Sequence, residues 1–302
     1  MSLFEPVNEG RVRPTAHTRG PWDPQALHGG AAAALIVRAF EQCRSEEAPA
    51  ADTPVAAGDT PVAAAGDTPV AAPTARGVIA RLGVEFVKPI PFAELSVSIE
   101  VVRSGRRVQE LAAELTAVSD GGSPGDELIG RANALRIQPV PGGLPDPDGR
   151  RELPGAGQVE SMAGPDAGEP IVFALDSTAL EGFATTGMHM RWLSDPRALG
   201  PARVWMALAQ PIVGQEPASP LQQLVATADF GNGVSRELDF ERYLFINADL
   251  TVHLWRAPRG EWIGLDTKTV LMDGGAGIAE SVLHDQHGPV GRSFQTLVIQ
   301  SR

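Results

Sequence analysis

The chain has 302 residues, about twice the length of an average domain, and it is 43% hydrophobic and 21% charged, as soluble globular proteins are. Its net charge of −12 argues against a general nucleic-acid-binding protein, because such a protein needs a basic face. The longest apolar run, residues 29–37, is too short to span a membrane, so we expect no membrane insertion. The first residues lack the basic and apolar regions of a secretory signal. The single cysteine, Cys43, excludes an internal disulfide framework and fits a reducing, cytoplasmic location.

The first predicted element is a helix over residues 28–43, where apolar side chains such as Leu35 and Phe40 recur at helical spacing in alanine-rich sequence. An Ala- and Pro-rich tract with three copies of Asp-Thr-Pro-Val-Ala-Ala follows it. We interpret this tract, residues 52–74, as a disordered insertion in a loop, because its composition cannot build a packed core. A partner-binding motif is the alternative interpretation of the tract.

The remainder of the first half predicts an antiparallel meander, because strand-like runs alternate with turn-rich loops. The three runs are residues 94–102, 108–118 and 127–138. Residues 141–170 are rich in Gly and Pro and are predicted to link an N-terminal module, residues 1–140, to a C-terminal module, residues 171–302.

The second half repeats this order. A helix is predicted from Ser219 to Ala228, where Ser219 and Pro220 have the residue types that cap and begin a helix. Three strands mirror those of the first half, over residues 262–271, 277–284 and 290–299.

An internal repeat relates the two halves. The run from Leu82 to Lys88 is similar to the run from Leu250 to Arg256, and a proline closely follows each. Ile129-Gly130-Arg131 is likewise similar to Val290-Gly291-Arg292, in the same order along the chain. The distance from helix to strand is longer in the first half, and the tract nearly accounts for the difference. The sequence therefore predicts a duplicated module.

One helix followed by an antiparallel meander, present twice, resembles the double hotdog fold, an α+β architecture in which a sheet wraps each helix. The segment from Trp22 to Leu35, which contains His28-Gly29-Gly30, is similar to the start of the central hotdog helix in acyl-CoA thioesterases. Residues 226–230 and 247–256 are similar to the C-terminal module of the type II acyl-CoA thioesterase family, in its actinobacterial-style branch. The resemblance covers nearly the whole chain except the insertion and the linker.

In that family an Asp, a Ser or Thr and a Gln hold the hydrolytic water. The resemblance implies Asp249, Thr269 and Gln295 in these roles, with Thr267 as the alternative hydroxyl on the same strand face. Each of the three also has a structural interpretation. Asp249 could end a strand or cap a helix, Thr269 is an ordinary strand former, and Gln295 could face solvent.

The start of the first helix is the second part of the implied site. His28, Gly29 and Gly30 are expected to bind the substrate, because backbone N–H groups at a helix N-terminus can polarise a thioester carbonyl. A histidine that only forms structural hydrogen bonds, and glycines that only permit close packing, are the alternatives.

The resemblance implies a cytoplasmic thioester hydrolase that acts on acyl-CoA or an acyl carrier, without a cofactor or a metal. A hotdog hydratase or dehydratase, which needs a histidine opposite an acid, and a non-catalytic acyl-binding protein are the rival functions. The sheet edges would allow homo-oligomers, although a monomer is also physically permissible.

Three other patterns are interpreted as structural. Gly121 to Gly125 matches Gly-x-Ser-x-Gly, but β sequence follows it where a nucleophile elbow needs a helix. His284 and His287 have the spacing of metal ligands but lie in a predicted turn without further ligands. A cluster of arginines on a hairpin is interpreted as solvated in preference to a site for CoA phosphates; it comprises Arg103, Arg106 and Arg107.

Overall fold

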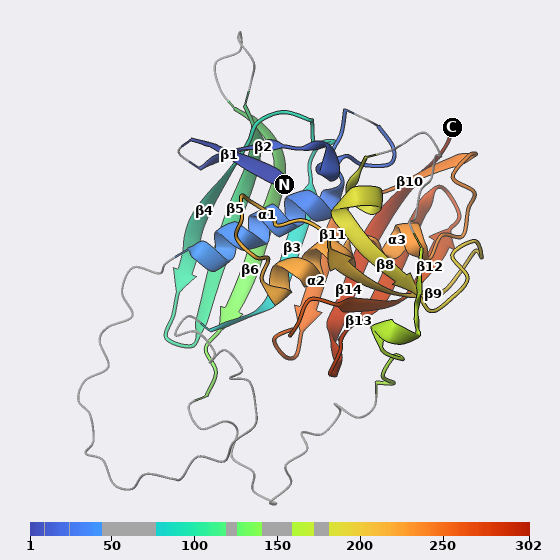
Figure 1. Ribbon diagram of the computed structural model, residues 1–302. Helices are drawn as coiled ribbons and strands as arrows, with labels where there is room; N and C mark the ends of the chain where they lie inside the picture. Colours follow the sequence, from blue (N-terminus) through green and yellow to red (C-terminus); the bar gives the residue numbers. More distant parts are fainter. Residues whose placement is uncertain (9, 24, 44–76, 119–125, 141–158, 172–180) are drawn as a thin grey trace, which may run out of the picture.

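The computed structural model describes residues 1–8, 10–23, 25–43, 77–118, 126–140, 159–171 and 181–302. The predicted insertion at 52–74, the motif at 121–125 and most of the predicted linker lie outside these ranges. Within them, fourteen strands form one antiparallel sheet that curves around two helices (Figure 1). The predicted α+β class is confirmed.

The predicted helices and meander strands are all present, with ends that differ by three residues or fewer. The first half contains β1 (Phe4–Asn8), β2 (Arg11–Pro14), α1 (Gly29–Gln42), β3 (Val78–Phe86), β4 (Leu95–Ser104), β5 (Val108–Ala117) and β6 (Glu127–Ile137). The second half contains β7 (Glu169–Pro170), β8 (Met188–Trp192), β9 (Ala202–Leu208), α2 (Pro220–Ala228), α3 (Gly231–Val234), β10 (Tyr243–Asn247), β11 (Asp249–Leu254), β12 (Ile263–Met272), β13 (Ala276–Asp285) and β14 (Gly288–Ser301). Short helical turns η1 (Ala16–Thr18), η3 (Pro165–Ala167) and η4 (Phe183–Gly187) complete the described elements. The sequence did not predict β1, β2, β7 to β10, α3 or the three short helical turns.

The strand order runs β1-β2-β4-β5-β6-β3-β11-β14-β13-β12-β9-β8-β7, and β10 pairs with β14 beside this path. The strands β3 and β11 therefore join the two halves of the sheet. These are the two strands of the sequence repeat, and their register is that of a local two-fold axis. Gly83 pairs with its repeat counterpart Thr251, while Leu82 pairs with Val252 and Val84 with Leu250. The predicted duplication is therefore visible in the backbone pairing at the centre of the sheet.

The helices α1 and α2 lie against each other on the same side of the sheet (Figure 1). The four alanines of the first half of α1, Ala31 to Ala34, are fully buried. Small side chains permit close approach of helix backbones, so the alanine-rich sequence that favours helix also allows this packing. Larger apolar side chains of α1, such as Ile36 and Phe40, complete the core on the sheet.

Each helix receives a carboxylate from the end of the other helix. Glu41, near the C-terminus of α1, accepts hydrogen bonds from Ser219 Oγ (2.8 Å) and Gln222 Nε2 (2.7 Å) at the start of α2. Ser219 also caps α2, because its Oγ accepts from the Gln222 N–H. Burial raises the pKa of Glu41, and these hydrogen bonds oppose the rise. The opposite crossing, where the end of α2 meets the start of α1, holds Asp229.

The predicted turn between β13 and β14 is held by a buried ion pair. Asp285, whose side chain is inaccessible, accepts two hydrogen bonds from the Arg256 guanidinium (2.5 and 2.7 Å) and one each from the Arg259 and His287 N–H groups. Burial favours the neutral acid, but the Arg256 and backbone hydrogen bonds outweigh it and lower the pKa of Asp285. Within the described ranges, no three metal-binding side chains gather at one point. No helix there is long and apolar enough to cross a membrane.

We predict that Asp285→Asn lowers the free energy of unfolding at neutral pH by about 3 kcal/mol, because it leaves Arg256 without its buried partner. The ordinary pKa of an aspartate is 3.8, and above this pH the contribution of Asp285 to the free energy of unfolding is fully present. This contribution is lost as the pH falls through the lowered pKa that Asp285 has in the folded state. Urea unfolding from pH 7 to pH 3 measures the difference between variant and wild type. The control is Asp266→Asn, because the Asp266–Arg203 pair is partly exposed and its loss should cost less than about 1 kcal/mol. Equal losses in both variants would contradict the prediction.

Candidate active site

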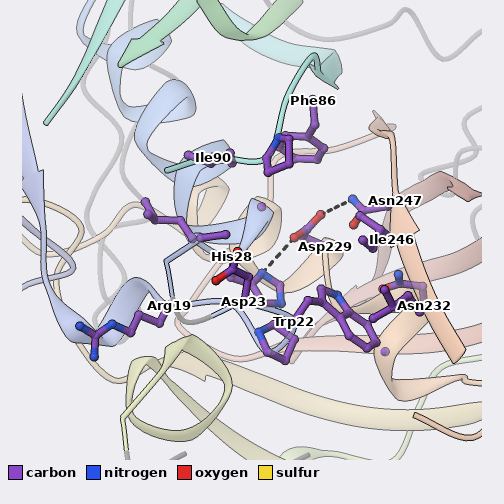
Figure 2. Close-up of a pocket in the computed structure, with 18 of the residues that line it drawn as sticks. Arg19, Trp22, Asp23, His28, Phe86, Ile90, Asp229, Asn232, Ile246 and Asn247 are labelled. Atoms are coloured by element: carbon purple, nitrogen blue, oxygen red, sulfur yellow. Dashed lines mark hydrogen bonds and ion pairs between the residues drawn. The ribbon is translucent and has the colours of Figure 1, made fainter. Parts of the chain in front are cut away.

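A cavity of about 660 Å³ opens where the two halves of the chain meet, at the start of α1 (Figure 2). Its walls come from the loop before α1, the end of β3, the turn between α2 and α3, and the segment joining β10 to β11. Most of the lining is apolar, with Trp22, Leu27, Phe86, Ile90, Phe240, Leu244 and Ile246 among the residues. The charged residues that line it are Arg19, Asp23, Lys88, Glu181 and Asp229.

The start of α1 is a helix N-terminus directed at this cavity. His28 is the N-cap residue, and its Nδ1 lies 3.1 Å from the Gly30 nitrogen. The first N–H groups of a helix have no intrahelical acceptors and carry partial positive charge. Gly29 N–H makes no hydrogen bond to any described residue, and both His28 and Gly29 line the cavity. The Gly29 N–H therefore has no acceptor among the described residues.

The two glycines permit the close approach of α1 to α2. A Cβ atom on Gly30 would lie 2.6 Å from the Ala226 carbonyl oxygen, and one on Gly29 would lie 2.8 Å from Asp229 Oδ2. Both distances are shorter than real Cβ contacts, so a side chain at Gly30 would push the two helices apart and one at Gly29 would displace the Asp229 carboxylate. The packing at the start of α1 therefore requires glycine at both positions.

Asp229 directly follows α2 and faces the start of α1. Its Oδ2 lies 3.0 Å from His28 Nδ1, and its Oδ1 accepts a hydrogen bond from Asn247 Nδ2 at 2.7 Å (Figure 2). Gln295 Nε2 lies 3.4 Å from the same Oδ1 and donates to the Asp229 backbone carbonyl at 2.9 Å. Asp229 is only 2% exposed, and a buried carboxylate is costly unless it is hydrogen-bonded in this way.

Gln295 links this carboxylate to the sheet. Its Oε1 accepts from the Asn232 N–H at 2.9 Å, so both ends of the buried amide hold the turn between α2 and α3. Gly231 makes the contact possible, because a Cβ there would lie 2.7 Å from Gln295 Oε1. Of the three side chains that the family resemblance implied, Gln295 lies against the cluster at the cavity.

The other two implied side chains lie elsewhere. Asp249 begins β11, where its Oδ1 accepts from the Thr296 N–H at 2.6 Å, and it does not line the cavity. Thr269 is buried behind α3, where its Oγ1 is 2.8 Å from Ser235 Oγ. Thr267 faces the same region and bonds to Ser281 Oγ at 2.9 Å. The hydroxyl groups of Thr267 and Thr269 therefore form hydrogen bonds between β12 and the ends of α3.

Comparison with known proteins assigns the family. A model of the acyl-CoA thioesterase N-terminal domain matches residues 18–136, and a model of the C-terminal domain matches residues 138–299. The chain belongs to the acyl-CoA thioesterase family. This thioesterase is accordingly a thioester hydrolase by class, and its two matched domains follow one another almost without a gap. No protein of curated function matches the chain.

Solved structures share the fold of the thioesterase at low sequence identity. A hot dog fold protein of Alicyclobacillus acidocaldarius is 15% identical, with 97% of this chain and 93% of that chain covered and a TM-score of 0.63. Acyl-CoA thioesterase II TesB2 of Mycobacterium marinum is 14% identical, with 99% and 96% covered and a TM-score of 0.55. The TesB protein of Mycobacterium avium subspecies paratuberculosis is 14% identical, with 98% and 96% covered and a TM-score of 0.55. The predicted double hotdog fold is confirmed.

Sequence reasoning did not single out Asp229 and Asn247, although both lie in the two runs that resemble the family. One signal was available for Asp229: a carboxylate at a helix C-terminus faces the negative end of the helix dipole. Because that position is electrostatically unfavourable for a carboxylate, an aspartate there indicates a stabilising contact elsewhere in the fold. Asn247 is separated from Asp249 by one residue, at the break between β10 and β11, and this break directs Asn247 toward Asp229 while Asp249 binds the backbone of β14.

We predict that Gly30→Ala destabilises the thioesterase by about 1–3 kcal/mol, because the new methyl group must displace the Ala226 carbonyl of α2. Gly233→Ala is the matched control, since a Cβ at Gly233 meets nothing within 4 Å. Thermal unfolding measures both variants. The steric interpretation would be contradicted if Gly30→Ala melted with the wild type or if Gly233→Ala lost equal stability.

Proposed function

We propose that the protein hydrolyses the thioester of an acyl-CoA, releasing a free acid and CoA, at the cavity between α1 and the α2–α3 turn. The observation that carries the proposal is the convergence on one cavity of a buried carboxylate, Asp229, and the uncapped amide of Gly29. Hydrolysis needs both kinds of group: one to activate water and one to stabilise the oxyanion. This proposal places Asp229 where the family resemblance implied Asp249.

The water-activating part of the site is built from a carboxylate and two amides. Asp229, Asn247 and Gln295 are joined by hydrogen bonds, so their relative positions are fixed before a substrate arrives. In the family an Asp, a Ser or Thr and a Gln hold the water. We infer that Asn247 takes the place of the hydroxyl residue, because its Nδ2 is an uncharged donor to the carboxylate.

The carbonyl part of the site is the start of α1. A thioester whose carbonyl oxygen accepts from Gly29 N–H would become more electrophilic at carbon, and the helix dipole would favour the negative charge that develops on oxygen. The absence of a side chain on Gly29 allows the Asp229 carboxylate to lie against the start of α1, beside this N–H group. The apolar cavity wall suits an acyl group, and Arg19 and Lys88 are the cationic residues that line it, where the phosphates of CoA could be met.

We predict that Asp229→Asn lowers kcat/KM for acyl-CoA hydrolysis about 10²-fold or more, because the variant keeps the shape of the site but removes its charge. Release of free CoA from acyl-CoA substrates of increasing chain length measures the rate. Asp249→Asn is the matched control: the new Asn can still accept from the Thr296 N–H, so we expect nearly wild-type activity.

Two outcomes would overturn parts of this proposal. A wild-type protein that releases no CoA from any acyl-CoA of the panel is not an acyl-CoA thioesterase. A wild-type activity that survives Asp229→Asn but not Asp249→Asn would return the catalytic carboxylate to Asp249.

A hotdog hydratase is the second candidate, and the contact between His28 and Asp229 favours it, since that reaction uses a histidine and an acid. The two functions are separated by adding an enoyl-CoA and an acyl-CoA to the same protein. Loss of the enoyl absorbance without release of CoA would favour the hydratase.

A further inference from the structure

His28 Nδ1 faces two groups that it cannot serve at once. Gly30 N–H lies 3.1 Å away and needs a lone pair on Nδ1, whereas Asp229 Oδ2 lies 3.0 Å away and needs a hydrogen on the same nitrogen. The bond to the carboxylate is charge-assisted, and such bonds are roughly twice as strong as neutral ones. The carboxylate contact therefore selects the tautomer with hydrogen on Nδ1, and the Gly30 N–H is released.

The other ring nitrogen is then an acceptor that faces the cavity. His28 Nε2 makes no hydrogen bond to the described part of the chain, and it is not a buried atom. The ring itself is fixed, because it stacks on Phe230 with centroids 4.4 Å apart and packs against Phe183 at 5.0 Å. Phe183 belongs to the π-helical turn η4.

Asp229 is less able to meet a water molecule itself. Its side chain is only 1% exposed, against 11% for His28, and its oxygens already face His28, Asn247 and Gln295. A base must come within hydrogen-bond distance of the proton that it removes. The more accessible of the two groups is the imidazole.

We propose that His28 is the general base of the hydrolytic reaction and that Asp229 is a positioning residue that holds its tautomer. This inference rests on the proposed thioesterase function and refines it: Asp229 acts on the water through the imidazole of His28 and does not contact the water directly. Water donates a proton to His28 Nε2 as its oxygen forms a bond to the thioester carbon, and the carbonyl π electrons move to oxygen. When the oxyanion collapses, the C–S bond breaks and the sulfur takes the proton from Nε2. The products are a carboxylic acid and a thiol, and His28 returns to its starting tautomer.

The charged groups around His28 come from several elements. Asp229 approaches from the end of α2, and Asp23 and Arg19 come from the loop before α1. Lys88 follows β3 and Glu181 precedes η4, and both line the same cavity. The segment from β10 to β11 contributes uncharged residues there, as does β14. Of these charged groups, Asp229 is the one within hydrogen-bond distance of the imidazole.

The tautomer can be tested on the wild-type protein without a substrate. Nitrogen-15 labelling of histidine and long-range nitrogen–proton correlation spectra distinguish hydrogen on Nδ1 from hydrogen on Nε2, and His28→Asn assigns the signal. We expect hydrogen on Nδ1 of neutral His28, and a change of this signal in Asp229→Asn. Hydrogen on Nε2 in the neutral wild-type ring would overturn the inference, because Nε2 could not then accept a proton.

The catalytic role is tested by the pH dependence of CoA release. His28→Asn keeps a residue that caps helices well, so the variant should fold, and it cannot act as a base. We expect the wild type to lose activity toward acidic pH, where the base takes up a proton, and we expect His28→Asn to lower kcat/KM roughly 10²- to 10⁴-fold and to abolish this acidic limb. Asp229→Asn should add little in the His28→Asn background, because the two residues act as one unit. His189→Asn, at an exposed position of β8, is the control for histidine removal.

The outcomes separate this inference from the proposed function. A wild type that releases CoA, together with a His28→Asn variant that keeps its rate and its acidic limb, would overturn the role of His28 and leave the thioesterase standing. A His28→Asn variant that fails to fold leaves the decision to the tautomer of the wild-type ring. A wild type that releases no CoA overturns the thioesterase function itself.

Discussion

The burial of one carboxylate at the crossing of two helices is the constraint on which this structure depends. Asp229 lies at the end of α2 and against the first turn of α1, where it is almost inaccessible to solvent. Its charge is compensated by His28, Asn247 and Gln295, which come from α1, β10 and β14. Removing any of these partners leaves a buried polar group unsatisfied, so the contacts that hold the helix crossing together are also those of the proposed site.

The glycines at the start of α1 follow from this constraint. The helix dipole attracts the carboxylate, but only a residue without a side chain lets the two backbones come so close. Buried alanines continue the close packing along α1. The cavity then opens beside the helix end, so that a substrate carbonyl would meet backbone donors on one side and the carboxylate cluster on the other.

The sequence was sufficient for the fold class and for the two main helices and the meander strands, because periodicity, caps and the repeat all agree, but it did not predict strands such as β1, β2 and β7 to β10. Ser219-Pro220 marks the start of α2, and the counterparts Gly83 and Thr251 meet at the centre of the sheet. The site was harder to predict, because it depends on where the chain turns between elements. Because one residue interrupts the strand between β10 and β11, the side chains of Asn247 and Asp249 bind different partners. The alternation of apolar and polar residues along a strand does not reveal such a break. Gln295 was implied by the family resemblance, and it lies within the long strand β14, where it contacts the Asp229 backbone.

The contact between Glu41 and the start of α2 shows how the two helix crossings of the duplicated chain differ. Two identical single-module chains paired about a two-fold axis would have the same residues at both helix crossings, and any mutation would alter both. In one duplicated chain the crossings are encoded separately. One has become a closed contact, in which Glu41 is bound by the cap of α2, while the other keeps a histidine beside its carboxylate and an open cavity. In a duplicated chain, a mutation can therefore change the contacts of one crossing while it leaves those of the other unchanged.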